Sequence, residues 1–213
     1  MNIEIKNKII IISSPSGAGK TTLCKMLVKK VKNVILSISY TSRNMRLNEI
    51  NGKDYYFVSK EKFIKLENNN HFIETSSNFN NLYGSPIKNI RKSNLLNKNI
   101  LFDIDWRGAR KIRKKFNKQD IIDIFILPPS VKELRKRLIK RGRDSKNEIK
   151  LRLSYALDEI KHYNEYSYVL INQNIHNTAN DIIDIVKYHD FIKKNDKLLD
   201  KNLKKIGRFL IIH

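Results

Sequence analysis

The most constraining feature of this chain is an unbroken run of isoleucines at residues 9–12 that leads into a turn of small residues. A continuous β-branched run of this kind is typical of a strand that is buried on both faces. The turn contains Gly17 and Gly19, and apolar residues at helical spacing predict a helix over residues 20–31 directly after it. A buried strand that turns at once into a helix indicates an α/β fold with a parallel sheet.

The rest of the chain alternates predicted strands and helices, apart from one irregular stretch. Apolar runs predict further strands at residues 34–38, 99–104, 121–127 and 168–172. Helical patterns cover residues 107–116, 130–141, 146–163 and 178–189. Such alternation favours a parallel sheet with helices on both faces. Residues 37–96 are polar and irregular, with clusters of Tyr and Phe, and predict a small inserted lobe of mixed α/β structure.

We expect one α/β domain over residues 1–190, with a three-layer core, the inserted lobe and a helical lid. The core is assigned to residues 1–36 and 97–190, the lobe to about 37–96 and the lid to about 138–152. Residues 191–213 predict a basic helical tail whose apolar stripe consists of Leu199, Leu203, Ile206 and Leu210. Packing of this stripe on the core or on a second subunit is favoured over a membrane or nucleic-acid role. Monomer and homo-oligomer both stay open.

The composition excludes several classes of protein. The chain is 40% apolar, which provides enough apolar surface for a folded core and argues against disorder. The single cysteine, Cys24, excludes an internal disulfide, a thiolate zinc cage and an iron–sulfur site, so we expect a reducing compartment. No apolar run approaches the ~20 residues of a membrane span, and a cytoplasmic location is the expectation.

The formal charge of +22 raises the question of an anionic partner. Asn, Lys and Ile are abundant along the whole sequence, and the lysines lie mostly between apolar residues, as on a solvated face. We therefore interpret the charge as diffuse, and expect neither a dedicated nucleic-acid partner nor a membrane partner.

The turn after the isoleucines has the chemistry of a phosphate-binding loop. Gly17 and Gly19 provide the bend that lets backbone N–H groups point inward, and the following helix adds a partial positive charge at its N-terminus. Lys20 is predicted to reach the β- and γ-phosphates of a nucleotide, and Thr21 to bind Mg²⁺. The usual pattern has glycine where this chain has Ser14, and serine fits the turn if its φ stays negative.

Asp103 is a candidate metal ligand because it closes the strand predicted at residues 99–104. Ligands of open α/β sheets bind at the carboxyl ends of the strands, where a carboxylate can hold Mg²⁺ through water. Taken alone, Asp103 and Asp105 are more typical of a cap for the following helix. Beside a phosphate-binding loop, the metal role is favoured for Asp103.

Further motifs follow the phosphate-binding loop along the chain. The first is the segment at residues 37–46, followed by Glu49, Gly52, Asp54, Tyr55 and Phe57. The others are Phe72-Ile73-Glu74, Tyr83-Gly84-Ser85, Asp103-Ile104-Asp105 and Pro128-Pro129-Ser130. In this order the motifs resemble those of guanylate kinases from about residue 9 to residue 172, and the first segment resembles that family's nucleoside-monophosphate lobe. The resemblance implies a P-loop fold and a Mg²⁺-dependent enzyme of purine nucleotide metabolism that phosphorylates GMP and dGMP with ATP.

For ATP, the resemblance assigns the loop residues and one residue after the last strand. These are Ser14, Pro15, Ser16, Gly17, Ala18, Gly19, Lys20, Thr21 and Asn172. In the family the asparagine lies close to adenine and is followed by two aspartates, whereas this chain has Asn172-Gln173-Asn174. The loss of both acids is expected to affect the capping of the loop or the fit of adenine.

The lobe has the chemistry to bind a nucleoside monophosphate. Arg43 and Arg46, three residues apart, can clamp phosphate oxygens with forked donors, and Tyr55 and Tyr83 offer hydroxyl groups. The resemblance adds Ser39 as a further phosphate contact.

Glu74 is the predicted base selector. Guanine presents N1–H and its 2-amino group as adjacent donors, and one carboxylate accepts from both, whereas adenine has an acceptor at N1 and no 2-amino group. Ser85 can donate to guanine O6, and the resemblance places Asp105 on the guanine side.

Phosphoryl transfer depends on alignment and positive charge more than on a protein nucleophile. The resemblance assigns catalytic roles to Lys20 and to Arg137, Arg141 and Arg152, which close on the ATP phosphates from the lid and its flanking helix. Gly142 would let the lid pivot. None of the five histidines lies in a motif, which argues against a Ser–His triad.

Three alternatives stay open. One is a kinase for another nucleoside monophosphate, and a second is a non-catalytic guanylate-kinase-like module that binds a phosphorylated peptide. Because such modules tend to lack a working phosphate loop, Lys20, Thr21 and the lid arginines count against the second alternative. The third is a basic nucleic-acid-binding protein, whose RNA binding would be salt-sensitive and independent of Lys20.

Overall fold

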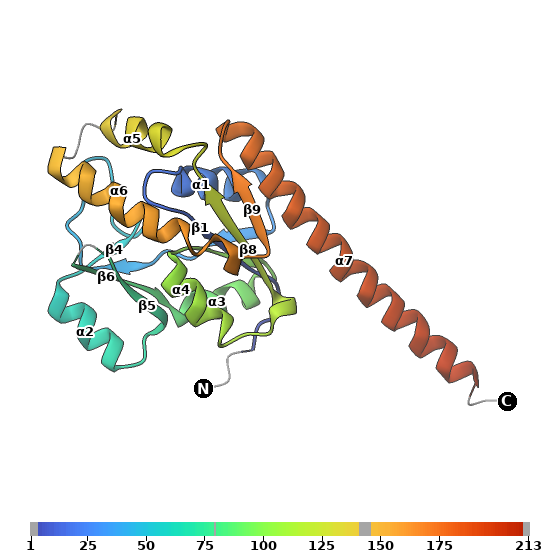
Figure 1. The fold of residues 1–213 in the computed structure, drawn as a ribbon. Coiled ribbons are helices and arrows are strands. Elements are labelled where there is room, and N and C mark those ends of the chain that lie inside the picture. Colours follow the sequence, from blue (N-terminus) through green and yellow to red (C-terminus); the bar gives the residue numbers. More distant parts are fainter. Residues whose placement is uncertain (1–3, 79, 141–145, 211–213) are drawn as a thin grey trace.

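The computed structural model describes residues 4–78, 80–140 and 146–210, with side chains from 149 to 195 in the last range. Its centre is a parallel sheet of five strands with helices on both sides (Figure 1). In spatial order the strands are β2 (Val34–Leu36), β7 (Asn99–Asp103), β1 (Ile9–Ser13), β8 (Ile121–Leu127) and β9 (Tyr168–Ile171). The predicted α/β fold with a parallel sheet is confirmed.

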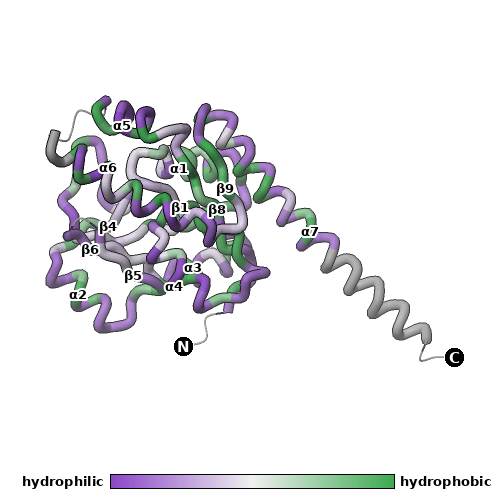
Figure 2. The backbone as a smooth tube through the Cα atoms, viewed as in Figure 1, coloured by the Kyte–Doolittle hydropathy of each residue, from purple (hydrophilic) through white to green (hydrophobic). Residues whose placement is uncertain are grey.

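The isoleucine run forms β1, the middle strand, and its side chains alternate between two hydrophobic cores. The helices over one core are α1 (Lys20–Lys30) and α7 (Ile175–Leu210), and those over the other are α3 (Ile87–Leu95) and α4 (Trp106–Arg113). Ile10 and Ile12 belong to the first core, and Ile9 and Ile11 to the second. Burial on both faces explains why the first four positions of β1 are all isoleucine. Figure 2 shows hydrophobic residues concentrated in the strands of this sheet.

The residues that follow β2 and precede β7 in the sequence form a second sheet, within the stretch where the sequence predicts a mixed lobe. In spatial order its strands are β4 (Tyr56–Phe57), β3 (Tyr40–Thr41), β6 (Asn81–Pro86) and β5 (Phe72–Asn78), and α2 (Lys60–Asn68) packs against it. Phe63 of α2 stacks on Phe72 of β5, with ring centroids 4.7 Å apart. This aromatic contact packs α2 against the second sheet.

The lid predicted at about residues 138–152 falls at the junction of two helices, α5 (Val131–Lys140) and α6 (Lys146–Ile160). Arg141 and Gly142, predicted as a catalytic residue and as the pivot, lie outside the described residues. Two short 3-10 helices, η1 (Lys118–Asp120) and η2 (Tyr163–Glu165), precede β8 and β9. The assignment of this region as a lid stays a prediction.

The C-terminal region differs from the predicted helix at residues 178–189 followed by a separate tail. Helix α7 runs without a break to Leu210, and Figure 1 shows its second half extending away from the rest of the molecule. The sequence has no glycine or proline between residues 175 and 206, so nothing there ends the helix. The predicted apolar stripe lies among residues whose side chains are not described. None of the described helices has the length and hydrophobicity needed to cross a membrane.

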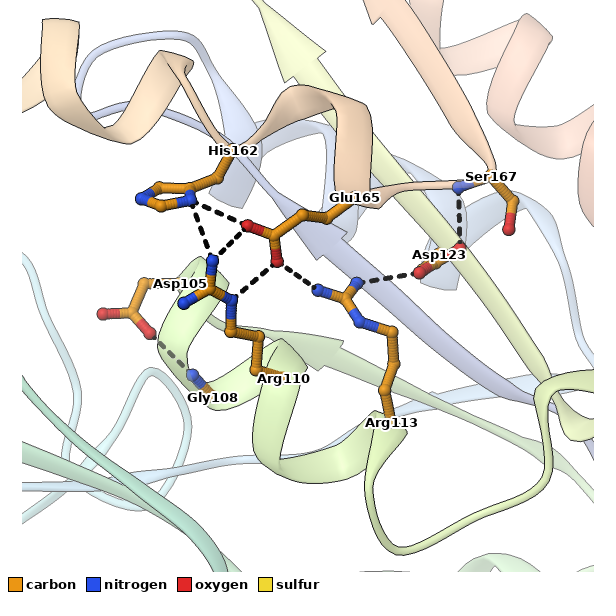
Figure 3. A network of polar contacts seen from close by, with 8 residues as sticks. All are labelled: Asp105, Gly108, Arg110, Arg113, Asp123, His162, Glu165 and Ser167. Atoms are coloured by element: carbon orange, nitrogen blue, oxygen red, sulfur yellow. Dashed lines mark hydrogen bonds and ion pairs between the residues drawn. The ribbon is translucent and has the colours of Figure 1, made fainter.

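A network of charged side chains ties α4 to the strands behind it (Figure 3). Glu165 of η2 accepts hydrogen bonds from Arg110 Nε at 2.8 Å and from Arg113 Nη2 at 3.1 Å. Arg113 also donates to Asp123 on β8 at 2.8 Å, and the other oxygen of Asp123 accepts the Ser167 N–H at 2.9 Å. Because Asp123 is only 4% exposed, its charge depends on Arg113 for compensation.

The network predicts a large effect of Arg113 on stability. Arg113→Met keeps the aliphatic stem but leaves the buried Asp123 carboxylate without its cation, which is expected to cost about 3 kcal/mol. Urea unfolding measures the difference, with Lys114→Met at the exposed end of α4 as the matched control. Equal unfolding free energies for the two variants would contradict this account of the network.

Candidate active site

The turn after β1 is a loop that only glycine allows at two positions. Gly17 has φ 97° and Gly19 has φ 100°, both in the left-handed region. A Cβ on Gly19 would lie 2.7 Å from Asn172 Nδ2, so the space is closed as well. The described non-glycine residues with positive φ are all asparagines. Ser14 therefore keeps a negative φ, the condition under which serine was expected to replace the usual glycine.

The first turn of α1 is open to an anion. Gly19 is the N-cap of this helix and supplies no side-chain cap, and the first turn contains no acidic residue. The N–H groups of this turn have no partner within the helix, and the helix dipole adds partial positive charge there. Together they form an anion-binding site at the end of the loop.

Lys20 and Thr21, the first residues of α1, both contact Asp103. Parallel pairing sets Ile12 opposite Asp103, which brings the carboxylate to the edge of the sheet where the loop begins. Lys20 Nζ lies 2.7 Å from Asp103 Oδ1, and the Thr21 hydroxyl donates to Oδ2 at 2.8 Å. Burial opposes the charge of Lys20, but the ion pair with Asp103 prevails and raises the pKa of Lys20 above its ordinary value. Lys20 is therefore a permanent cation at the loop.

The same pair fits Mg²⁺. Magnesium is usually held by one or two carboxylates, water and substrate phosphates rather than by a cage of protein ligands. Asp103 supplies a carboxylate, and the Thr21 hydroxyl, which donates to Asp103, keeps its lone pairs available. No group of three or more His, Cys, Asp or Glu side chains with metal-binding geometry occurs in the part of the chain that the structure describes. An ion here would thus need the phosphates to complete its coordination.

Glu159, which sequence reasoning missed, reaches the loop from α6. Its Oε2 accepts the Ser16 N–H at 3.0 Å, and the residue is only 6% exposed. Burial raises the pKa of Glu159 above its ordinary value. The contact links residues 143 positions apart, so no local pattern signals it. It connects the helix that follows the predicted lid directly to the phosphate loop.

Asn172 is hydrogen-bonded to the backbone of the phosphate loop. Its Nδ2 donates to the Ala18 carbonyl at 2.8 Å, its Oδ1 accepts from Thr178 at 3.3 Å, and it is only 2% exposed. Its carbonyl accepts from Arg137 at 3.0 Å. The structure thus places Asn172 behind the loop, and its predicted contact with adenine stays a prediction.

Asn174 takes over part of the role expected for the lost acids. Its Oδ1 accepts the N–H groups of His176 at 2.9 Å and of Asn177 at 3.2 Å, in the first turn of α7. An asparagine is as good an N-cap as an aspartate. Capping at this position therefore survives the loss of both acids.

The loop and the second sheet enclose a cavity of about 280 Å³. Most of the predicted site residues line it: Ser14, Pro15, Ser16, Gly17, Gly19, Lys20, Thr21, Ser39, Arg43, Arg46, Tyr55, Glu74, Tyr83, Asp103, Asp105 and Arg152. Glu159 lines it as well. Ala18 and Ser85 are fully buried behind this wall. Arg137 does not line the cavity and binds Asn172 instead, while Arg141 lies outside the described residues.

One wall of the cavity gathers positive charge. Arg43 is held by a two-pronged ion pair with Glu49, at 3.0 and 2.9 Å, and its guanidinium lies 5.4 Å from the ring centroid of Tyr55. Burial, followed by the charges of Arg43 and Arg152, lowers the pKa of Arg46. Burial raises the pKa of Tyr55, so that it stays a neutral hydroxyl. An anion with several oxygens would relieve the repulsion between these guanidinium groups.

A buried carboxyl group with one unpaired oxygen, that of Glu74, also lines the cavity. Glu74 on β5 is 3% exposed, and its Oε1 accepts from Ser85 on β6 at 2.6 Å. Ser85 also contacts the Ser39 hydroxyl at 3.1 Å. Among the described residues, Glu74 Oε2 has no hydrogen-bond partner. Burial raises the pKa of Glu74 to about 7, because desolvation disfavours the charged form.

Asp105 combines both roles considered for it. It is the N-cap of α4, where Oδ1 accepts the Gly108 N–H at 2.9 Å, and Oδ2 lies 3.4 Å from Arg107 Nη1. It also lines the cavity beside Glu74. The helix-capping interpretation is confirmed for Asp105, and its contact with a base stays a prediction.

Comparisons with known proteins agree with this arrangement. The sequence model of the family described as guanylate kinase matches residues 6–189. A guanylate kinase of Rickettsia prowazekii (strain Madrid E) is 44% identical over 186 residues, which are 87% of this chain and 93% of that protein. A guanylate kinase of Histophilus somni (strain 129Pt) is 45% identical over 185 residues, covering 85% and 88%.

A solved structure is similar as well. The crystal structure of guanylate kinase from Anaplasma phagocytophilum matches with a TM-score of 0.72 and 35% identity, and the match covers 87% of each chain. The phosphate loop, the two sheets and the sequence similarity thus lead to the same conclusion: this chain belongs to the guanylate kinase family.

Proposed function

We propose that this chain transfers the γ-phosphoryl group of ATP to GMP, and to dGMP, giving ADP and the diphosphate, as a cytoplasmic enzyme of purine nucleotide recycling. The observation that carries the proposal is the buried Glu74 carboxylate, whose Oε2 has no partner among the described residues and lies in the same cavity as the phosphate loop. Guanine supplies the two adjacent donors that this carboxylate needs. Leaving a buried acceptor unpaired costs about 1–3 kcal/mol, which a bound base would recover.

The two substrates would share the cavity. The loop amides and Lys20 would bind the triphosphate of ATP, and Lys20 would exchange its contact with the Ile104 carbonyl for phosphate oxygens. Arg43, Arg46 and Tyr55 would bind the phosphate of GMP and hold it in line with the transferring group. Arg152, already at the cavity, would stabilise the charge that spreads over the equatorial oxygens. Arg137 and Arg141 are proposed to join it when the lid closes.

Thr21 and Asp103 would hold Mg²⁺, which would supply positive charge against that of the phosphates. The protein itself aligns the two substrates, excludes water and supplies fixed positive charge.

The first test is the choice of acceptor. Release of ADP is measured with GMP, AMP, UMP and CMP at saturating ATP, and we expect substantial turnover with GMP alone. Glu74→Gln replaces one acceptor by a donor and is expected to lower kcat/KM for GMP about 100-fold. Glu61→Gln, at the exposed start of α2, is the matched control and should behave as the wild type. Unchanged GMP turnover in Glu74→Gln would indicate another acceptor, and no turnover at all would favour a binding module.

A second test follows from the pKa of Glu74. In the unfolded chain the carboxyl ionises near pH 4.5, whereas in the free folded protein it keeps its proton up to about pH 7. Between these values the folded state binds more protons, so this group lowers stability as the pH rises. Glu74→Gln removes the effect and should gain about 2.5 kcal/mol relative to the wild type between pH 5 and pH 8. Urea unfolding of both proteins without ligand measures it, and parallel profiles would refute the assignment.

A third test separates the phosphate loop from the acceptor site. Lys20→Ala removes the cation from the loop and is expected to lower kcat about 1,000-fold, because phosphoryl transfer depends on electrostatic stabilisation. Binding of GMP, measured by calorimetry, should change less than threefold. Lys29→Ala, at the exposed end of the same helix, is the control. A retained kcat in Lys20→Ala would contradict the role of the loop.

A further inference from the structure

We propose that Gly108, in the first turn of α4, is a specificity-determining residue, because the absence of a side chain there lets the Glu74 carboxylate reach its position in the cavity. The inference rests on the proposed function, since the selectivity concerned is that for guanine. Gly108 would touch no substrate itself and would act through Glu74.

The backbone of α4 does not require glycine at this position. The glycines with positive φ in the described part of the chain are Gly17, Gly19 and Gly52, and Gly108 is not among them. Its N–H bond to the capping Asp105 would be available to any residue except proline. Within a helix, glycine is less stable than alanine. A glycine here therefore needs a reason outside the helix.

The reason is the close approach of Glu74. A Cβ added to Gly108 would lie 2.6 Å from Glu74 Oε2 and 3.2 Å from its Cδ. It would also lie 3.3 Å from Ile104 Cδ1. Real Cβ atoms almost never approach another atom within 3.0 Å, so either the carboxylate or the helix would have to move.

The helix cannot move away easily, because both of its sides are tied down. On the side of β5, Lys111 donates to the Thr75 carbonyl and hydroxyl, and Lys115 donates to the Ile73 carbonyl. Lys111 follows Gly108 by three residues and shares its face of the helix, and Lys115 lies just beyond the end of α4.

The other side of α4 is held by the charged network of Figure 3. Arg110 and Arg113 both donate to Glu165, and Arg113 also donates to the buried Asp123. A shift of α4 away from β5 would have to strain or break these bonds. A shift of Glu74 would strain only its hydrogen bonding with Ser85, whose hydroxyl donates to Oε1. The carboxylate is therefore the group expected to give way.

Displacement of the Glu74 carboxylate is expected to weaken some purine bases more than others. Recognition of guanine needs one carboxylate oxygen for N1–H and the other for the 2-amino group. Hypoxanthine has the N1–H but no 2-amino group, so it depends on a single oxygen. A hydrogen bond to a charged group contributes about 1.5–3 kcal/mol, which corresponds to roughly 10- to 100-fold in affinity. Displacement should thus weaken GMP more than IMP.

The experiment compares binding of GMP and IMP to Gly108→Ala by calorimetry. We expect the Kd for GMP to rise about 10- to 100-fold, the preference for GMP over IMP to fall about tenfold, and the KM for ATP to stay unchanged. The unfolding midpoint should not fall, because alanine favours the helix. Lys114→Ala, at the exposed end of α4, should leave both Kd values unchanged. A Gly108→Ala variant with wild-type Kd values would overturn the inference.

A double-mutant cycle tests whether the effect passes through the carboxylate. In the Glu74→Ala background there is no carboxylate to displace, so adding Gly108→Ala should change the Kd for GMP less than twofold. An equal loss in both backgrounds would show a general distortion and would overturn the inference. If the wild type neither binds nor phosphorylates GMP, the proposed function itself fails. Normal wild-type activity with an unaffected Gly108→Ala removes only the role of Gly108.

Discussion

Parallel pairing of β1 with β7 is the interaction on which the site depends. It sets Ile12 opposite Asp103, so the beginning of the phosphate loop and the carboxylate meet at one edge of the sheet. Lys20 and Thr21 then reach Asp103 from the first turn of α1. Because β1 is buried on both faces, a slip of one residue would exchange the side chains of the two cores, and burial therefore fixes the register. The run of isoleucines thus positions the chemistry as well as the fold.

Features of the fold and the site that depend on neighbouring residues could be predicted. The strand, the glycine turn and the helix are adjacent in the sequence, and each has a strong local preference. The position of Asp103 follows from a general rule, since carboxyl ends of parallel strands share one edge of the sheet. The requirement that Ser14 have a negative φ also follows from the turn sequence alone. Most predicted elements occur, although the strand predicted at residues 34–38 ends at Leu36 and the helix predicted at 107–116 ends at Arg113.

Contacts between distant segments could not be predicted in the same way. The bond from Ser16 to Glu159 joins the loop to a helix far along the chain, and an acid on a helix surface carries no signal of its partner. The second role of Asn172, beneath the loop, appears only when the last strand is placed beside it. The continuous α7 was missed for a different reason, because a change in composition near residue 190 suggested a boundary although nothing there ends a helix. The sequence does contain one signal of a long-range contact. Gly108 lies inside a helical pattern, where glycine destabilises the helix, and such a glycine indicates a close contact with another segment.

The cavity is lined both by neighbouring guanidinium groups and by the buried carboxyl group of Glu74, and this has consequences for the protein without its substrates. The guanidinium of Arg46 is repelled by those of Arg43 and Arg152, and Glu74 is buried with one oxygen unpaired. Both groups therefore destabilise the free protein. Glu49 holds the Arg43 guanidinium, and Ser85 holds the Glu74 carboxyl group. A ligand that stabilises both Arg46 and Glu74 must carry an anion as well as hydrogen-bond donors, at a fixed separation. These groups destabilise the free protein, and the binding of a suitable ligand removes part of that destabilisation. A whole nucleotide satisfies both the arginines and Glu74, whereas its base or its phosphate alone satisfies only one of them, so the same groups favour the whole nucleotide.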